Sequence, residues 1–443
     1  MKPTPFILLL FLLLGSISLG NSATQQITNT KIPQTFSGQV DMCLGCHLEE
    51  PDKAHARQVL GCFECHLGNP LAGTKKAAHK GMIKNPGELS ISPKTCGQSG
   101  CHVKEVDWVQ NSLMATNRGI ISTLRYYWGE TDSHSENITI KTIKEKGLDS
   151  PALDYFRKMC GSCHIGLEKG VLPDFLSRKG GGCSACHNSM AGIDSKPREK
   201  RHPQIIRFVP MANCVKCHNR SGRIGLSYQG MFESEGYGTP FIDGDFAPYQ
   251  LDDGRFYLPM KPDIHYAKGL ICIDCHTQKE IMGDGNMKAH IEEQIEIKCV
   301  TCHRSQNELN SLAKKEGILN DNGQARDLSK RPISKINIKK LKNGQIALLG
   351  KKDNSDHILN PPLSEGCNSG AHSRLTCQAC HATWVPQCYG CHVKADKSQK
   401  QLDKLSGKMT YGSWTEFRSF IRYETPALGV NRKENKVVIL VPG

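Results

Sequence analysis

The stretch from Cys43 to His66 reads CLGCHLEEPDKAHARQVLGCFECH and contains the pattern Cys-x-x-Cys-His twice, with one further histidine, His55, between the two copies. The pattern, or a close variant of it, returns eight more times along the 443 residues, and twenty of the 21 cysteines belong to it. The ten motifs are Cys43/Cys46/His47, Cys62/Cys65/His66, Cys96/Cys101/His102, Cys160/Cys163/His164, Cys183/Cys186/His187, Cys214/Cys217/His218, Cys272/Cys275/His276, Cys299/Cys302/His303, Cys377/Cys380/His381 and Cys388/Cys391/His392.

Nine of these motifs are Cys-x-x-Cys-His and one, CGQSGCH, is Cys-x4-Cys-His. Chance would supply about 0.04 copies of the nine, and this spacing is the attachment pattern of c-type haem. On a helical turn, residues i, i+3 and i+4 share one face. Both sulfurs can then bond to the haem vinyl groups while the imidazole reaches the iron. The sequence therefore predicts about ten covalently attached haems, with the motif histidines as proximal iron ligands.

Zinc sites and disulfides also use paired cysteines, but both fit this chain less well. Structural zinc is held by pairs of such knuckles, usually without a histidine directly after the second cysteine. Disulfides are common in exported proteins but do not account for ten adjacent histidines. With motifs from Cys43 to His392, the chain resembles the multihaem c-type cytochromes. Parts of it resemble the octahaem oxidoreductases, the tetrathionate-reductase-like proteins and the metal-reducer cytochromes.

Eight histidines lie outside the motifs, and a low-spin haem iron needs a ligand on each face. Six of them come shortly before a motif and are predicted distal ligands: His55, His79, His202, His265, His290 and His372. The resemblance implies that such a histidine often serves a haem other than the one that follows it. His134 and His357 lie in polar stretches, where either a distal ligand or a surface histidine fits.

Ten motifs and eight further histidines leave at least two irons without a distal histidine from this chain. A methionine could bind instead, and Met42, Met114, Met159 and Met211 lie near motifs, although methionine beside a haem is more often packing. The site could be open and allow substrate chemistry, or a neighbouring subunit could donate a histidine. The sequence leaves these three alternatives open.

The spacing of the motifs predicts the organisation of the chain. The fold class expected is mostly irregular and α-helical, with short helices at the attachment turns, haems as the core and a minor β-hairpin. The segments expected are a signal peptide (1–23), an N-terminal three-haem module (24–103), a central five-haem module (104–303), a haem-free segment (304–366) and a C-terminal two-haem module (367–443).

Local patterns add detail to this plan. Asn343-Gly344, between alternating apolar and polar residues, is typical of a hairpin. The stretches KEVDWVQNSLMATNRG and ISTLRYYWGE have a helical pattern, and the long loop from Tyr228 to Met260 is expected to cover haem edges or to form a lid or interface. Cys367 is the odd cysteine, for which a buried thiol, an intermolecular disulfide and an unusual haem link are the alternatives.

The N-terminus carries Lys2, an apolar run from Phe6 to Leu14 and a small-residue exit up to Ala23. This is the pattern of a cleaved signal peptide, and the run is shorter than the roughly 20 residues that span a bilayer. We therefore expect an exported protein, periplasmic or extracellular, that is not an integral membrane protein.

The net charge of +14 would ordinarily suggest a nucleic-acid partner. Each ferric haem carries a net charge of about −1 once its two propionates are counted, so ten haems would bring the oxidised protein close to neutral. We therefore expect many Lys and Arg side chains to pair with propionates and expect no nucleic-acid partner.

Three functions compete for such a chain. The first is an electron conduit of closely packed, mostly bis-histidine haems, which exchanges electrons with redox proteins or with an extracellular acceptor. The second is an oxidoreductase that reduces or oxidises a small nitrogen or sulfur oxyanion at an open haem; no catalytic residue is assignable from the sequence. The third is self-assembly into a cytochrome filament.

Overall fold

The structure is a computed structural model of the whole chain. It describes residues 34–35, 38–47, 49, 51–189, 202–219, 224–233, 249–250, 256–319, 337–361, 366–367, 369–382, 385, 387–388, 391–418, 421–422, 426–432 and 434–440. The predicted signal peptide and most of the loop between Tyr228 and Met260 lie outside these residues. Among the residues that the structure does describe, no helix is both long and apolar enough to cross a membrane.

Short helices dominate the chain up to residue 319. The first are η1 (Met42–Gly45), α1 (Cys62–His66), α2 (Lys75–Ala78), η2 (Ser92–Lys94), α3 (Val103–Asn111), α4 (Leu113–Thr116), α5 (Arg118–Tyr127), α6 (Ile140–Lys146), α7 (Pro151–Tyr155), η3 (Phe156–Cys160), α8 (Asp174–Ser177) and α9 (Cys183–His187). They are followed by α10 (Met211–Val215), α11 (Ile224–Ser227), α12 (Ile264–Ala267), α13 (Cys272–Cys275), α14 (Gln278–Met282), η5 (Ile291–Glu293), α15 (Cys299–Cys302), α16 (Gln306–Lys315), η7 (Gly370–His372) and α17 (Cys377–His381).

The strands form small antiparallel sheets. They are β1 (Asn188–Ser189), β2 (Gln204–Ile205), β3 (Met231–Glu233), β4 (Tyr249–Gln250), β5 (Phe256–Pro259), β6 (Ile338–Lys340), β7 (Ile346–Leu349), β8 (Asp356–Ile358), β9 (Gln387–Cys388), β10 (Cys391–Asp403), β11 (Lys408–Arg418), β12 (Ile421–Arg422), β13 (Leu428–Asn431) and β14 (Lys436–Ile439). Two sheets have three strands, in the orders β3-β5-β4 and β6-β7-β8, and the other pairs are β1-β2, β10-β11, β9-β12 and β13-β14.

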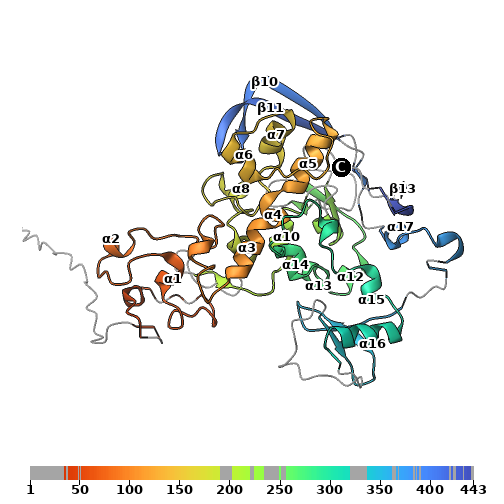
Figure 1. Cartoon of the computed structure of the whole chain (residues 1–443), viewed down its shortest axis with the longest axis horizontal. Helices are drawn as coiled ribbons and strands as arrows, with labels where there is room; N and C mark the ends of the chain where they lie inside the picture. The colour runs from red at the N-terminus through yellow and green to blue at the C-terminus, as the bar shows by residue number, and fades with distance from the viewer. Residues whose placement is uncertain are drawn as a thin grey trace, which may run out of the picture.

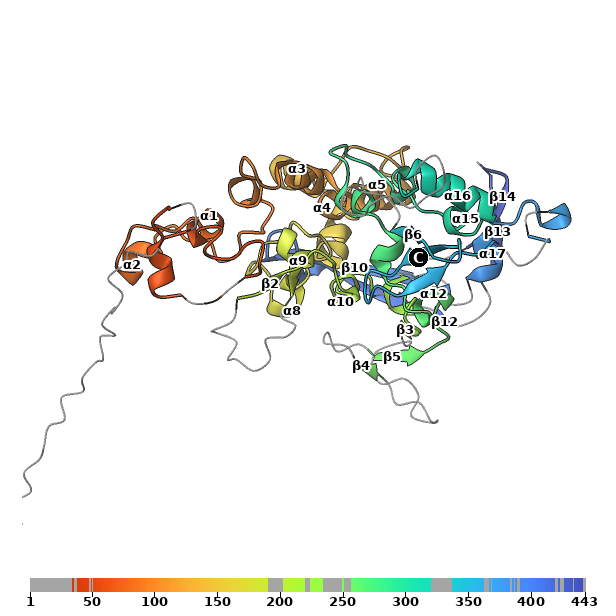
Figure 2. The same ribbon diagram turned by 90° about the horizontal axis from the view of Figure 1, so that it is seen from below.

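The molecule is elongated, and Figures 1 and 2 show the N-terminal helices α1 and α2 at one end and α17 with β13 at the other. Between them, α3, α4 and α5 follow one another as the helical pattern of their sequence predicts. Ser112 begins α4 by accepting a hydrogen bond from the Ala115 amide (3.3 Å). Side-chain caps of this kind satisfy amides that have no partner inside the helix.

The buried apolar side chains form separate small clusters. One packs α16 against the β6-β7 hairpin through Leu309, Ala313, Ile338 and Ile346 among others. This hairpin lies where the sequence predicts one: the Leu341 amide donates to the Gln345 carbonyl (2.8 Å), and Gly344 has a φ of +89°. A second cluster joins α5, α6, α7 and η3 to Leu405, in the turn between β10 and β11.

The long β10-β11 ribbon is a feature that the sequence analysis did not anticipate. The two strands pair from Cys391↔Arg418 to Asp403↔Lys408, with a register shift between Asp396 and Lys400. The signal for it is weak because few residues of the segment alternate in polarity, and its turn, around Gly407, lacks an Asn-Gly or Asp-Gly pair. Contacts with η3 stabilise it, including the hydrogen bond from the Lys404 amide to the Arg157 carbonyl (2.9 Å).

The glycine run before Cys183 is required by close backbone packing. Gly182 has a φ of +61°, and a Cβ there would lie 2.0 Å from the Gly87 carbonyl oxygen. We expect Gly182→Ala to lower the free energy of unfolding by at least about 1–3 kcal/mol, the usual cost of one strained backbone position. Chemical denaturation checks this. Gly73→Ala is the matched control, since nothing lies within 4 Å of its Cβ position, and an equal loss in both variants would contradict the prediction.

Candidate functional site: the cysteine–histidine motifs

Five of the described motifs adopt the helical turn that the spacing predicts, in α1, α9, α13, α15 and α17, and the first cysteine of the fourth motif ends η3. In several motifs the histidine amide folds back onto the first cysteine. The amides of His276 and His303, for example, donate to the Cys272 and Cys299 carbonyls (2.9 Å each). This geometry places both sulfurs and the imidazole on one face.

The first and sixth motifs are helical only in part. In the first, η1 ends at Gly45, so Cys46 follows the helix and is exposed. In the sixth, α10 ends at Val215, and both Cys217 and His218 lie beyond it. The expectation that one helix carries all three residues is therefore wrong for these two motifs.

The physical reason is a tighter turn at the second cysteine. The Cys46 amide donates to the Cys43 carbonyl (3.1 Å), and the Cys217 amide donates to the Cys214 carbonyl (3.2 Å). Hydrogen bonds from i+3 to i of this kind end an α-helix or replace it with a 3-10 turn. The His218 amide still reaches the Cys214 carbonyl (3.0 Å), so the three residues of the sixth motif stay close together.

The third and tenth motifs depart further from the helical turn. In the third, the two extra residues form a loop in which the Cys101 amide donates to the Gln98 carbonyl (2.9 Å). The His102 amide closes this loop on the Cys96 carbonyl (2.8 Å), and Cys101 is left exposed. A helical turn is therefore wrong for the third motif, because two inserted residues cannot fit into a single turn.

In the tenth motif, Cys388 belongs to β9, and Cys391 and His392 begin β10. The expectation of a helical turn is wrong here too, because strand pairing of His392 with Phe417 holds its backbone extended.

Four motif histidines each face a histidine from outside the motifs. The ring centroids of His47 and His79 are 6.0 Å apart, and those of His66 and His202 are 6.1 Å apart. The centroids of His55 and His102 are separated by 6.2 Å, and those of His265 and His303 by 6.1 Å. Two imidazoles on opposite sides of one metal ion, each bound at about 2.0–2.1 Å, would have centroids roughly 6 Å apart.

Hydrogen bonds at Nδ1 orient many of these rings. Nδ1 donates to a backbone carbonyl in His66 (Ile83, 2.7 Å), His187 (Ile206, 2.8 Å), His202 (Pro203, 2.8 Å) and His303 (Asn360, 3.2 Å). It contacts a carboxylate in His55 (Asp52, 2.9 Å), His265 (Asp263, 2.8 Å) and His276 (Glu280, 2.9 Å). Because these oxygens accept, Nδ1 carries the proton and the lone pair of the neutral ring lies on Nε2, the usual arrangement of a metal-binding histidine.

The partner of each of these non-motif histidines is not the motif that follows it. His55 precedes the second motif but faces the third, and His79 precedes the third but faces the first. His202 and His265 likewise face the second and the eighth motif. Sequence spacing selected these four residues, but only the fold shows which motif each one faces.

The structure places the remaining four non-motif histidines elsewhere. His290 Nε2 donates to the His134 carbonyl (2.9 Å), and the His134 ring stacks on Tyr126 with centroids 3.5 Å apart. His357 Nε2 is 2.9 Å from the Ser355 hydroxyl, and His372, which ends η7, is exposed. Their assignment as distal ligands stays a prediction.

The first three motifs are tied together by buried polar contacts. The Asp41 carboxylate, which is fully buried, accepts from the Cys43 amide (3.0 Å) and from the Cys62 amide (2.7 Å). Burial, Asp41 and the Cys43 thiol raise the pKa of Cys62 to about 12. The Gln98 amide group inside the third motif donates to the Glu64 carbonyl inside the second (2.7 Å).

The contacts then pass from the third motif to the fifth and onward. The Cys183 thiol forms a hydrogen bond with Cys96, which lowers the pKa of Cys96 to about 6, and the Asn213 side chain donates to the Cys186 carbonyl (2.8 Å). Cys214 and Cys272 are likewise hydrogen-bonded. These contacts join the fifth, sixth and seventh motifs.

Motifs seven, eight and nine continue this series. Glu280 contacts His276 and accepts from the Glu296 amide (2.6 Å), just ahead of the eighth motif. Burial raises the pKa of Glu280, but the hydrogen bonds from His276 and the backbone outweigh it, so the net shift is downward. The Cys299 and Cys377 thiols interact in turn. The motif helices α1, α10, α15 and α17 therefore follow the long axis in this order, as both views show (Figures 1 and 2).

His164 of the fourth motif has a different environment from the other motif histidines. Its side chain is 6% exposed, and neither Nδ1 nor Nε2 has a hydrogen-bond partner. Burial, followed by the nearby Lys144 charge, lowers the pKa of His164 to about 4. A buried imidazole without hydrogen bonds is costly unless another group binds it.

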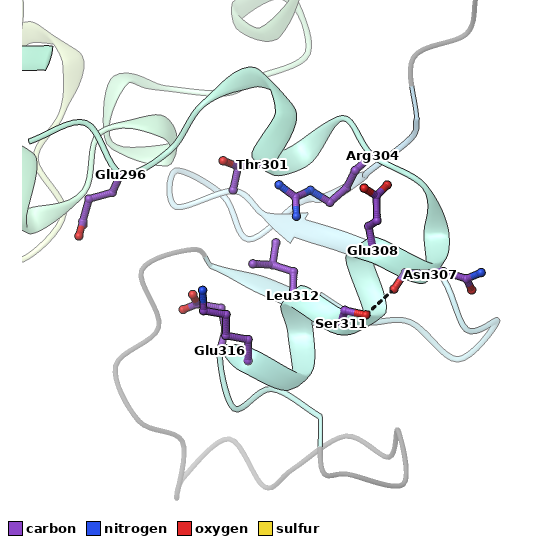
Figure 3. A pocket seen from close by; sticks show the side chains of 9 residues that line it. Glu296, Thr301, Arg304, Asn307, Glu308, Ser311, Leu312 and Glu316 are labelled. Carbon is purple, nitrogen blue, oxygen red and sulfur yellow. Dashed lines mark hydrogen bonds between the residues drawn. The ribbon is translucent and has the colours of Figure 1, made fainter. Parts of the chain in front are cut away.

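A pocket lies beside the eighth motif, on the side of α15 that carries Thr301 (Figure 3). It has a volume of about 530 Å³, and its lining is mostly polar: Glu296, Thr301, Arg304, Asn307, Glu308, Ser311, Leu312, Lys315 and Glu316. No cysteine or histidine lines it. It is therefore separate from the attachment face of the motif.

The odd cysteine, Cys367, is exposed. The buried thiol that the sequence analysis gave as one alternative is therefore wrong, because the backbone around Cys367 lies at the surface and covers it with nothing. An intermolecular disulfide and an unusual haem link stay predictions.

The cysteines and metal-binding groups show no competing arrangement in the described part of the chain. No disulfide joins the cysteines whose side chains are described, from Cys43 to Cys380. No group of three or more His, Cys, Asp or Glu residues there has the geometry of a metal site. No family model matches this chain, and no curated protein or solved structure is similar enough to count as a match.

Proposed function

We propose that this chain is an exported decahaem c-type cytochrome that passes electrons along a series of closely spaced, mostly bis-histidine haems. The four facing histidine pairs carry this proposal. Each pairs a motif histidine with a distant one, at a separation that suits two ligands of one iron. Nδ1 hydrogen bonds that leave Nε2 for a metal, and the orphaned nitrogens of His164, also fit haem binding.

A bound haem would supply an iron that cycles between the ferric and ferrous states. The residues of this chain would hold each group on two sulfurs and one imidazole, and the facing histidine would close the other side. Contacts between motifs, through Asp41, Gln98, Asn213 and Glu280, would keep neighbouring groups close. The partners would be redox proteins or an extracellular acceptor.

The haem content tests this proposal directly. We expect the intact mass of the purified protein, secreted by a host with a c-type maturation system, to equal that of the mature chain plus ten haems. Denaturation should release none of them, because thioether bonds persist. In the Cys214→Ala/Cys217→Ala variant we expect nine. A chain that loses its colour on denaturation, or that carries zinc in the motifs, would contradict the proposal.

The oxidoreductase alternative has one observation in its favour, the environment of His164. The filament alternative has no contact in its support here and stays a prediction.

A further inference from the structure

The fourth motif lies beside the series of motif-to-motif contacts, next to the fifth motif. The Gly182 amide, at the start of α9, donates to the Ile165 carbonyl (2.7 Å), and the Gly181 amide donates to the Leu167 carbonyl (2.7 Å). The third and fifth motifs contact each other directly through Cys96 and Cys183. The fourth motif is therefore a branch that could exchange electrons with the series without being a step in it.

His164 has no histidine opposite it in the described structure. It lines a small cavity of about 30 Å³ together with Lys144, Gly166, Leu167, Glu168, Val171 and Leu405. The charged or titratable groups acting on it are Lys144 and Cys163. None of the four histidines still without a motif partner lines this cavity. A space of this size holds a water or a ligand of a few atoms.

We infer that the iron of the fourth motif is open to a small exogenous anion, with Lys144 as the cationic residue at the mouth of its site. This inference rests on the proposed haem content. It identifies one of the irons that the histidine count leaves without a distal histidine. Lys144 is exposed on α6, so its ammonium is available to an incoming anion, whereas Leu167 and Leu405 close the inner wall. The ligand class is an anion of two to four atoms, with cyanide and azide as probes.

Cyanide binding to the oxidised full-length protein tests this inference, with absorbance difference spectra and EPR as readouts. We expect a high-spin ferric signal that cyanide converts to low spin. The Cys160→Ala/Cys163→Ala variant should lose the response of this iron, and the Cys272→Ala/Cys275→Ala variant should keep it. Persistence of the full response without the fourth motif, or no response in the unaltered protein, would overturn the inference.

The mass of the two variants separates this inference from the proposed function. Nine haems in each, with no change in the cyanide response, would leave the proposed function standing and remove the inference. A protein without covalent haem would remove both.

Lys144→Ala provides a second measurement that does not depend on folding of a haem-deleted chain. Removing one charge from a partly exposed site is expected to raise the azide dissociation constant about fivefold. Lys146→Ala is the matched control, because it removes the same charge two residues along, on the opposite side of α6. Equal affinities in the two variants would show that Lys144 does not face the bound anion.

Discussion

Replacing His55 with alanine is expected to convert one low-spin iron, and only one, into a high-spin iron that belongs to the third motif. The reason is the 6.2 Å separation between the His55 and His102 ring centroids, which places His55 opposite that motif. Loss of the distal imidazole leaves the iron with His102 alone. EPR of the oxidised protein, integrated against the total haem, measures the new signal.

Haem-deletion backgrounds show which iron has changed. In a Cys96→Ala/Cys101→Ala background, which lacks the third haem, His55→Ala should produce no new high-spin signal. In a Cys62→Ala/Cys65→Ala background, which lacks the haem nearest to His55 in sequence, the signal should appear in full. The opposite result would assign His55 to the second motif and contradict the geometry.

The same experiment has a second use at His290. Since the Nε2 of His290 donates to the His134 carbonyl, the arrangement seen here does not leave that nitrogen for a metal. His290→Ala should then leave the low-spin signals unchanged, whereas the sequence-based prediction of a distal ligand requires one iron to change.

The helical turns of half of the motifs were predictable because the spacing itself matches one face of a helix. Facing histidines were predictable as a set but not as pairs. His202 and His66 are far apart in sequence, and nothing local specifies that β2 and the end of α1 meet. The hairpin at Asn343-Gly344 was accessible because turn chemistry acts within four residues.

The β10-β11 ribbon and the tenth motif show the limit of local reasoning. The spacing Cys388-x-x-Cys391-His392 is the same as in the helical motifs, yet here the second cysteine and the histidine lie on a strand. Pairing with β11, from Arg418 and Phe417 onward, overrides the helical preference of the spacing. Tertiary context of this kind is invisible to a pattern of five residues.

The ribbon is held to the body of the molecule by a buried ion pair, which gives the largest stability effect that we expect. Lys158 is fully buried, and its ammonium lies 2.7 Å from the Asp154 carboxylate. It also donates to the Tyr411 carbonyl on β11. The other oxygen of Asp154 accepts from the Trp414 indole (2.7 Å), so one carboxylate joins α7, η3 and the ribbon.

Asp154→Ala is therefore expected to lower the free energy of unfolding by about 3–5 kcal/mol, because it leaves the Lys158 ammonium buried without its counter-charge. Guanidinium titration followed by Trp fluorescence measures this. Hydrogen exchange should accelerate in β10 and β11 ahead of the remaining strands, since Trp414 and Tyr411 lose their anchor.

The double variant Asp154→Leu/Lys158→Met separates the charge from the packing. Replacing both members of a buried pair by apolar residues is often close to neutral, so most of the loss should be recovered. Lys141→Ala breaks an exposed pair on the nearby α6, where the side chains are 82% and 62% exposed, and should cost less than about 0.5 kcal/mol. If Asp154→Ala cost no more than Lys141→Ala, the ribbon would have to be held by its aromatic contacts, in which Trp414 lies 5.3 Å from both Trp128 and Tyr155.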